Sequence, residues 1–116
     1  GLVKLPKQIP SRIAMELALT GDFISAERAA DLGLINPVVA SGTALDAAKA
    51  LAAKIAANGP LAVAASKRVV ASAPDWTSDV AFKNQNDIVM PVFSSEDAIE
   101  GATAFAEKRA PNWKGK

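Results

Sequence analysis

Histidine, cysteine and tyrosine are all absent from this 116-residue sequence, and only 5% of its residues are aromatic. Without histidine or cysteine, the chain cannot form a histidine-based catalytic triad, a thiol nucleophile or a zinc site with histidine or cysteine ligands. The lack of cysteine also excludes disulfide bonds. Any chemistry within the chain must therefore use carboxylates, lysines or backbone amides.

Neither sign of charge predominates, and no apolar stretch is long. Thirteen Lys and Arg residues face twelve Asp and Glu residues, for a formal net charge of +1, which removes the electrostatic case for binding nucleic acid or a membrane surface. No segment approaches the roughly 18 apolar residues of a membrane span, and the first residues lack the apolar run of a signal peptide. The sequence therefore predicts a cytoplasmic protein with no nucleic-acid or membrane partner.

Alanine is abundant and accounts for 25 of the 58 hydrophobic residues. Because alanine is the best helix former and a poor strand former, this excess predicts a mainly α protein with closely packed helices. Apolar spacing and the positions of caps, glycines and prolines predict six helices. These are residues 11–20, residues 26–32, the stretch between Thr43 and Asn58, the stretch from Pro60 to Pro74, a stretch capped by Asp75 or Thr77, and a last stretch capped by Ser94 that runs to Arg109.

Two segments do not follow a helical pattern. Residues 1–10 contain two prolines and are expected to be irregular. Residues 34–39 are an apolar, partly β-branched run that Pro37 interrupts, so they are the only strand candidate, either as a small edge strand or as a buried extended connection. Pro91 is expected to kink or end the fifth predicted helix.

Several local strings occur in the order typical of one enzyme family. They are Leu19-Thr20-Gly21-Asp22 with Ile24-Ser25-Ala26, Ala30-Asp31-Leu32-Gly33-Leu34-Ile35-Asn36, Gly59-Pro60-Leu61-Ala62 through Ser66-Lys67, and Ser95-Glu96-Asp97 with Glu100-Gly101 and Phe105-Ala106-Glu107-Lys108-Arg109. Together these strings resemble the C-terminal portion of the enoyl-CoA hydratase/isomerase, or crotonase, superfamily. The resemblance covers essentially the whole chain and points to the superfamily rather than to one member.

The resemblance implies a fold and a division of the chain. We expect the C-terminal helical oligomerisation region of a crotonase-like ββα superhelix, mainly α with at most one short strand near residues 34–39. Residues 1–40 would be the end of the crotonase core region, with a loop, two short helices and the short strand. Residues 41–116 would be a C-terminal helical region of the kind that forms trimers.

The resemblance also implies that the catalytic groups lie upstream of this chain. In the family, the backbone amides that hold the thioester oxyanion and the acidic catalytic residues belong to the N-terminal part, and none of those motifs occurs here. Gly1-Leu2 resembles the end of the glycine-rich loop that follows the last catalytic carboxylate, so the chain would begin just downstream of the chemistry. We therefore predict that it contains no catalytic residue and is inactive alone.

Phe105 and Lys108 are the candidate binding residues, because a spacing of three places them on one face of the last predicted helix. In the family, these positions are associated with the adenine and 3′-phosphate end of coenzyme A, often across a subunit boundary. An aromatic face can stack on a base, and a lysine ammonium is a suitable charge for a phosphate. The alternative is structural: Phe105 would be a core residue and Lys108 a cation that stabilises the helix dipole.

Other possible sites have simpler explanations. Glu96 and Glu100 share one helix face like a catalytic carboxylate pair, but capping and solubility explain them. Ser66 and Lys67 are adjacent on a helix and point roughly 100° apart, which argues against a nucleophile and its base. Four large aromatic residues could line either an interface or the core: Trp76, Phe82, Phe93 and Trp113.

Two functions are consistent with the sequence. The first, implied by the resemblance, is the C-terminal part of an enoyl-CoA hydratase of fatty-acid degradation, which adds water reversibly to a trans-2-enoyl-CoA. Its substrate would be a coenzyme A thioester, with no metal or tightly bound cofactor, and its partners would be the N-terminal portion of the same enzyme and further copies in a trimer or hexamer. The second is a non-catalytic, alanine-rich helical interaction or oligomerisation protein. The first function requires an apolar surface where the rest of the enzyme docks.

Overall fold

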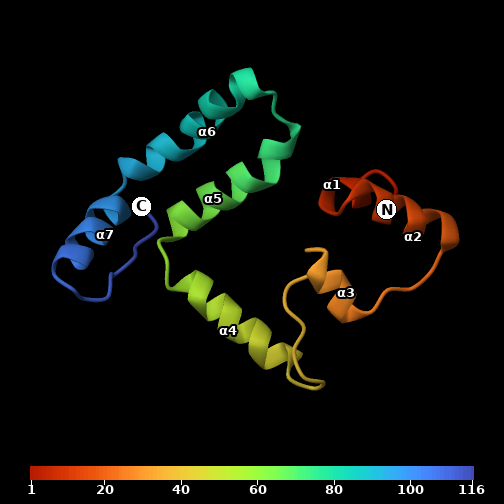
Figure 1. The fold of residues 1–116 in the computed structure, drawn as a ribbon. Helices are drawn as coiled ribbons and strands as arrows, with labels where there is room; N and C mark the ends of the chain where they lie inside the picture. The colour runs from red at the N-terminus through yellow and green to blue at the C-terminus, as the bar shows by residue number, and fades with distance from the viewer. The chain divides into compact units, whose positions relative to one another are not determined.

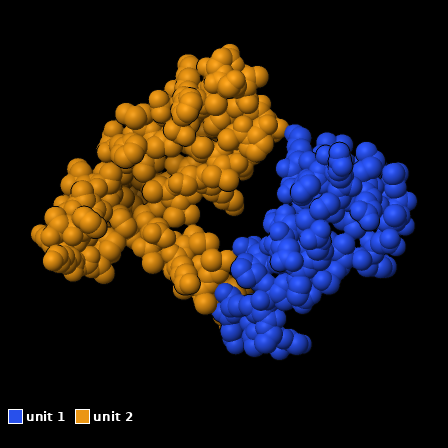
Figure 2. Space-filling model, in the orientation of Figure 1, with its two compact units in different colours: residues 1–47 blue, residues 48–116 orange.

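The chain consists of helices and connecting segments in a computed structural model that describes residues 1–116. Figure 1 shows the elements in order: α1 (Leu5–Gln8), α2 (Ser11–Thr20), α3 (Ala26–Asp31), α4 (Ala44–Ala56), α5 (Pro60–Ser72), the 3-10 helix η1 (Ala73–Asp75), α6 (Ser78–Phe93) and α7 (Glu96–Ala106). The mainly α class predicted from the alanine content is confirmed. The chain divides into two compact units, residues 1–47 and residues 48–116 (Figure 2), while the functional division after residue 40 stays a prediction.

The beginning of the chain and the strand candidate differ from the sequence-based expectations. Residues 1–10 are not wholly irregular, because α1 forms with Pro6 in its first turn, where the missing proline N–H leaves no hydrogen bond unmade. Residues 34–39 form no strand. The N–H of Leu34 donates to the carbonyl of Ala29 and closes the end of α3, and Pro37 has no N–H, so two of the six residues cannot donate to a β-ladder.

In the first unit, the caps predicted from the sequence end and begin the helices. Gly21 ends α2 with a φ of 70°, a left-handed conformation that glycine adopts without a steric penalty. The hydroxyl of Ser25 accepts a hydrogen bond from the N–H of Arg28 at 3.1 Å and caps α3. Burial is confined mostly to small side chains, since Ala14 and Ala29 are among its few buried residues.

In the second unit, α5 and α6 pack side by side and run in opposite directions, joined by η1 (Figure 1). Asn58 ends α4 by donating its side-chain amide to the carbonyl of Lys54 at 2.8 Å. Pro60 then occupies the first position of α5. Helix α6 begins after Thr77, one of the two caps considered, and continues two residues past Pro91. The apolar groove between α5 and α6 is lined mainly by small and aliphatic side chains: Leu61, Ala64, Ala65, Ile88 and Val92.

The chain buries little of its apolar surface. Its buried hydrophobic residues are Ile9, Ala14, Ala29 and Ala104, whereas most large aliphatic and aromatic side chains are exposed. The accessible surface is 9043 Å² for a mass of 12.0 kDa. Surface scaling gives about 6,000 Å² for one compact monomer of this mass and about 7,200 Å² for two separately folded parts. The apolar surface that docking requires is therefore present. None of the helices combines the length and apolar character needed to cross a bilayer.

Candidate functional site

Helix α7 begins one residue later than predicted. Its cap is Ser95 and not Ser94. The hydroxyl of Ser95 accepts a hydrogen bond from the N–H of Ala98 at 3.1 Å and donates one to the carbonyl of Val92 at 2.6 Å. The same hydroxyl thus satisfies one free donor of α7 and adds a hydrogen bond to a carbonyl in the last turn of α6.

The end of α7 corrects the predicted geometry of Phe105 and Lys108. The helix ends at Ala106 rather than at Arg109, so the two residues do not share a helix face. Instead, Lys108 has a φ of 56° and its N–H donates to the carbonyl of Phe105 at 3.2 Å, while the N–H of Arg109 donates to the carbonyl of Ala104 at 3.0 Å. This is the Schellman arrangement, in which the left-handed residue is usually glycine.

The structure nevertheless keeps the two candidate binding residues together at the surface. Phe105 is 88% exposed and therefore is not the core residue of the structural alternative. Lys108 is also exposed, and its backbone bond to Phe105 makes the two residues neighbours in the turn that ends α7. Their assignment to coenzyme A stays a prediction.

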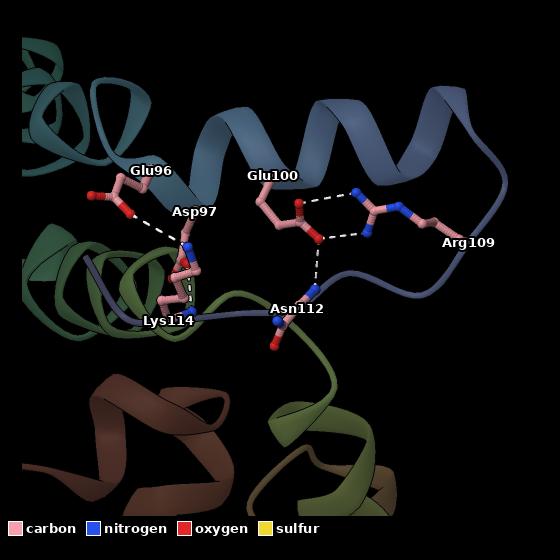
Figure 3. A pocket seen from close by; sticks show the side chains of 6 residues that line it. All are labelled: Glu96, Asp97, Glu100, Arg109, Asn112 and Lys114. Atoms are coloured by element: carbon pink, nitrogen blue, oxygen red, sulfur yellow. Dashed lines mark hydrogen bonds and ion pairs between the residues drawn. The ribbon is translucent and has the colours of Figure 1, made fainter.

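Glu100 is the polar centre of a network that fastens the C-terminal tail, residues 107–116, to α7 (Figure 3). Its Oε1 and Oε2 accept hydrogen bonds from Nη1 and Nη2 of Arg109 at 2.6 and 3.1 Å. Its Oε1 also accepts the backbone N–H of Asn112 at 2.7 Å. The Arg109 guanidinium also donates from Nε to Glu107 at 2.6 Å. Glu100 is therefore a structural anchor, a role that the capping and solubility explanation missed.

The ion pair shifts the pKa values of both partners. The hydrogen bonds from Arg109, together with that from the Asn112 N–H, lower the pKa of Glu100 from 4.5 to about 2. The hydrogen bonds to Glu100 and Glu107 raise the pKa of Arg109. Both groups keep their charges at neutral pH, so Glu100 is poorly suited to act as a general acid there.

Asp97 holds the last residues of the tail through their backbone. It is only 4% exposed, and its carboxylate accepts the N–H of Lys114 at 2.7 Å and the N–H of Gly115 at 2.9 Å. Its own N–H donates to the carbonyl of Lys116 at 3.0 Å. Asp97 is the second residue of α7, and its side chain binds the tail.

Trp113 packs the tail against glycines from two other parts of the second unit. Its indole Nε1 donates to the carbonyl of Ala57 at 2.8 Å. A Cβ atom added to Gly59 would lie 3.5 Å from the indole, and one added to Gly101 would lie 3.0 Å from it. Of the four aromatic residues considered for an interface, Trp113 is thus an internal packing residue. Trp76 is half-buried, while Phe82 and Phe93 are 76% and 70% exposed.

The tail and α7 enclose a cavity of about 270 Å³ with charged walls. Figure 3 shows its lining residues, which are Glu96, Asp97, Glu100, Arg109, Asn112 and Lys114. The carboxylates are paired with cations or backbone N–H groups, including Glu96 with Lys114 at 3.8 Å. No group of three acidic residues is placed to hold a metal ion. This arrangement can hold the tail in place, and the exposed Phe105 and Lys108 are not among its lining residues.

The residues of this network stand out in the sequence, but only the fold shows that they contact one another. Glu100, Gly101 and Arg109 all belong to one of the strings on which the family resemblance rests. A glycine inside a helix costs about 1 kcal/mol of stability relative to alanine. Gly101 is nevertheless suited to its position in α7, because a Cβ there would lie 3.0 Å from the indole of Trp113. The separation of nine positions between Glu100 and Arg109 hid the pair, because helical spacing rules consider only separations of three or four.

Comparisons with known proteins find similarity along the whole chain. The profile described as enoyl-CoA hydratase/isomerase matches residues 1–116. Enoyl-CoA hydratase EchA19 of Mycobacterium tuberculosis is 47% identical over 114 residues, which cover 98% of this chain and 43% of that protein. The carnitinyl-CoA dehydratase of Proteus mirabilis is 39% identical over 120 residues, covering 100% of this chain and 46% of that protein.

Solved structures give the same result. The crystal structure of an enoyl-CoA hydratase from M. tuberculosis superposes with a TM-score of 0.95 at 58% identity, over 99% of this chain and 46% of that one. The structure of enoyl-CoA hydratase EchA1 from Mycobacterium marinum gives the same TM-score, identity and coverage. The chain therefore spans less than half the length of the relatives it matches.

Proposed function

Because the chain belongs to the enoyl-CoA hydratase/isomerase family and corresponds to its C-terminal part, we propose that it is part of an enoyl-CoA hydratase. The complete enzyme would add water reversibly to a trans-2-enoyl-CoA. The observation that carries this proposal is the similarity to an enoyl-CoA hydratase of M. tuberculosis, at 58% identity and a TM-score of 0.95 over 99% of the chain. Carnitinyl-CoA dehydratases are also among the relatives, and an assay with several acyl-CoA substrates would identify the acyl group.

The part of this chain in the reaction would be to bind the coenzyme A end of the substrate. Phe105 is 88% exposed, and an aromatic face of this kind can stack on adenine. Lys108 lies next to it in the turn, and its ammonium can donate charge-assisted hydrogen bonds to a phosphate. The structure records no ion pair that would occupy this ammonium.

The groups that act on the acyl chain would lie in the rest of the enzyme. In the mechanism implied by the family resemblance, backbone amides stabilise the enolate oxygen of the thioester, and paired glutamates activate water and move the proton. Two observations on this chain agree with that division. Glu100 is engaged with Arg109, and Asp97 is engaged with the backbone of the tail.

The partners would be the remaining part of the enzyme and further copies of it in a trimer or hexamer. The large exposed apolar side chains of both units and the accessible surface of 9043 Å² support this part of the proposal. The predicted cytoplasmic location belongs to the proposal as well, and cell fractionation with an antibody to the chain would test it.

Turnover of crotonyl-CoA tests the proposal. We expect the complete enzyme to hydrate crotonyl-CoA and the purified 116-residue chain to show no activity. In the complete enzyme, replacing Lys108 with Ala should raise KM, whereas replacing the exposed Lys83, which pairs with Asp87 on α6 at 2.8 Å, should not. A complete protein that binds no coenzyme A thioester but assembles normally would favour the alternative function, a non-catalytic interaction protein.

A further inference from the structure

Lys108 has a positive φ, a backbone conformation that only glycines adopt elsewhere in this chain. It is the only residue other than glycine with a positive φ; the others are Gly21, Gly33, Gly42 and Gly115. Gly33 performs the same task as Lys108, because its φ of 74° ends α3 with the same pair of backbone hydrogen bonds. A side chain in the left-handed region is strained relative to glycine. A lysine here therefore implies a use for its side chain that outweighs this strain.

The residues around Lys108 keep the turn in place. On one side, α7 ends with the carbonyl of Phe105 bound to the N–H of Lys108. On the other side, the guanidinium of Arg109 is fixed by two hydrogen bonds to Glu100 and one to Glu107. The carboxylates of Glu100 and Glu107 also neutralise Arg109, so the charge next to Lys108 is already compensated. The turn thus presents one ammonium group without an ion-pair partner, three residues after an exposed aromatic side chain.

We infer that Glu100 and Arg109 are positioning residues that act through Lys108: their ion pair holds the left-handed turn in which the Lys108 ammonium meets a ligand phosphate beside Phe105. This inference rests on the proposed function, since it takes the phosphate to be that of coenzyme A. The lowered pKa of Glu100 supports it, because the carboxylate remains charged throughout the physiological range.

Binding of coenzyme A and of 3′-dephospho-coenzyme A to the complete enzyme tests the inference. The ratio of the two affinities isolates the contact with the 3′-phosphate from the fold as a whole. Lys108→Gly and Lys108→Ala should both reduce this ratio, by about tenfold, as expected for loss of a hydrogen bond to a charged group. Lys108→Gly should also raise Tm by about 2–4 °C because it relieves the backbone strain, whereas Lys108→Ala should not.

Two variants test the positioning role. Glu100→Gln removes the charge of the carboxylate, and Arg109→Lys keeps the positive charge but loses the bidentate pair with Glu100. Each should reduce the affinity ratio by about threefold or more, because a loosened turn presents the ammonium less often. Glu96→Gln is the matched control on the same helix, since Glu96 makes only longer ion pairs with Lys114 and Lys116, and it should leave the ratio unchanged.

The outcomes distinguish the phosphate contact of Lys108 from the positioning role of Glu100 and Arg109. An unchanged ratio in Lys108→Gly would overturn the proposed phosphate contact itself. A reduced ratio in Lys108→Gly with an unchanged ratio in Arg109→Lys and Glu100→Gln would overturn only the positioning role. Glu100 and Arg109 would then serve only to fasten the tail. If Glu100→Gln does not fold, Arg109→Lys decides the question alone. A lower Tm in Lys108→Gly would overturn the argument from strain.

Discussion

The first unit and the end of the second unit differ in how far along the chain their side-chain hydrogen bonds reach. In residues 1–47, the hydroxyls of Thr20 and Thr43 bond to carbonyls only four and three residues away, while Leu19 and Phe23 are 78% and 102% exposed. In the region of α7 and the tail, the side-chain hydrogen bonds connect residues up to 56 positions apart, as between Trp113 and Ala57.

This difference shows which side chains find their partners within the 116 residues. A hydrogen bond requires a donor and an acceptor at a defined distance and angle, so the network around Asp97 and Glu100 specifies one arrangement of the tail. Apolar side chains such as Phe23 require only that water be excluded, and other polypeptide can do that equally well. The polar network therefore fixes the tail with groups of this chain alone, whereas the large apolar side chains of the first unit such as Leu19 and Phe23 are left exposed.

Removing the indole of Trp113 should have the largest effect on the tail. Trp113→Ala deletes the packing against Gly59 and Gly101 and the hydrogen bond to Ala57, and we expect the local opening of the tail to become easier by about 3 kcal/mol. Hydrogen exchange at the N–H groups of Lys114 and Gly115 measures this opening. Phe105→Ala, at an exposed position, is the control, and equal protection in both variants would contradict the role given to Trp113.

A smaller effect should come from Gly101, and its sign should depend on Trp113. Gly101→Ala places a Cβ 3.0 Å from the indole, so we expect a loss of about 1–2 kcal/mol despite the better helix propensity of alanine. In the Trp113→Ala background the clash is gone, and the same substitution should stabilise the helix by about 1 kcal/mol. Additive effects in this double-mutant cycle would rule out the proposed contact.

The ion pair of Glu100 should make the tail sensitive to acid. Its pKa is about 2 in the folded chain against an ordinary value of 4.5, so the unfolded chain takes up the proton at higher pH than the folded chain does. The stabilisation is therefore complete above about pH 4.5 and is lost as the pH falls towards 2. Tail protection measured by hydrogen exchange across this range should decline in the native chain.

A comparison variant separates Glu100 from the other carboxylates. Glu27, mainly through its own backbone N–H, and Asp79, mainly through Thr77, also have lowered pKa values. In Glu100→Gln, the pH dependence of tail protection should be flatter than in the native chain between pH 4.5 and 2. A pH profile that is unchanged by this substitution would assign the acid sensitivity to another group.

The smallest effect on this chain should come from the exposed apolar face of the first unit. Phe23→Ser should change the free energy of unfolding of the 116-residue chain by less than about 0.5 kcal/mol, because the ring is fully exposed and loses no contact. In the complete enzyme the same change should weaken assembly, as measured by analytical ultracentrifugation. A large loss of stability in the isolated chain would show that Phe23 packs within it.

Local chemistry in the sequence was sufficient to predict most helices. Gly21 and Ser25 act as the expected stop and cap, and Pro60 begins α5 as expected, because these roles depend on the backbone conformations and hydrogen bonds of a few adjacent residues. The choice between neighbouring caps was less secure. Ser95 rather than Ser94 begins α7, because Ser94 is still the C-terminal cap of α6 and the next residue is the first that is free to cap α7.

The sequence by itself determined the helical class and the family, and it predicted Phe105 and Lys108 as ligand-binding residues. Only the tertiary structure decided how those residues are presented. Helical spacing predicted a shared face, but α7 ends at Ala106 and Lys108 turns into the left-handed region. The physical reason is that Glu100 and Arg109, nine positions apart, form an ion pair when the tail folds back, a contact that no local periodicity encodes.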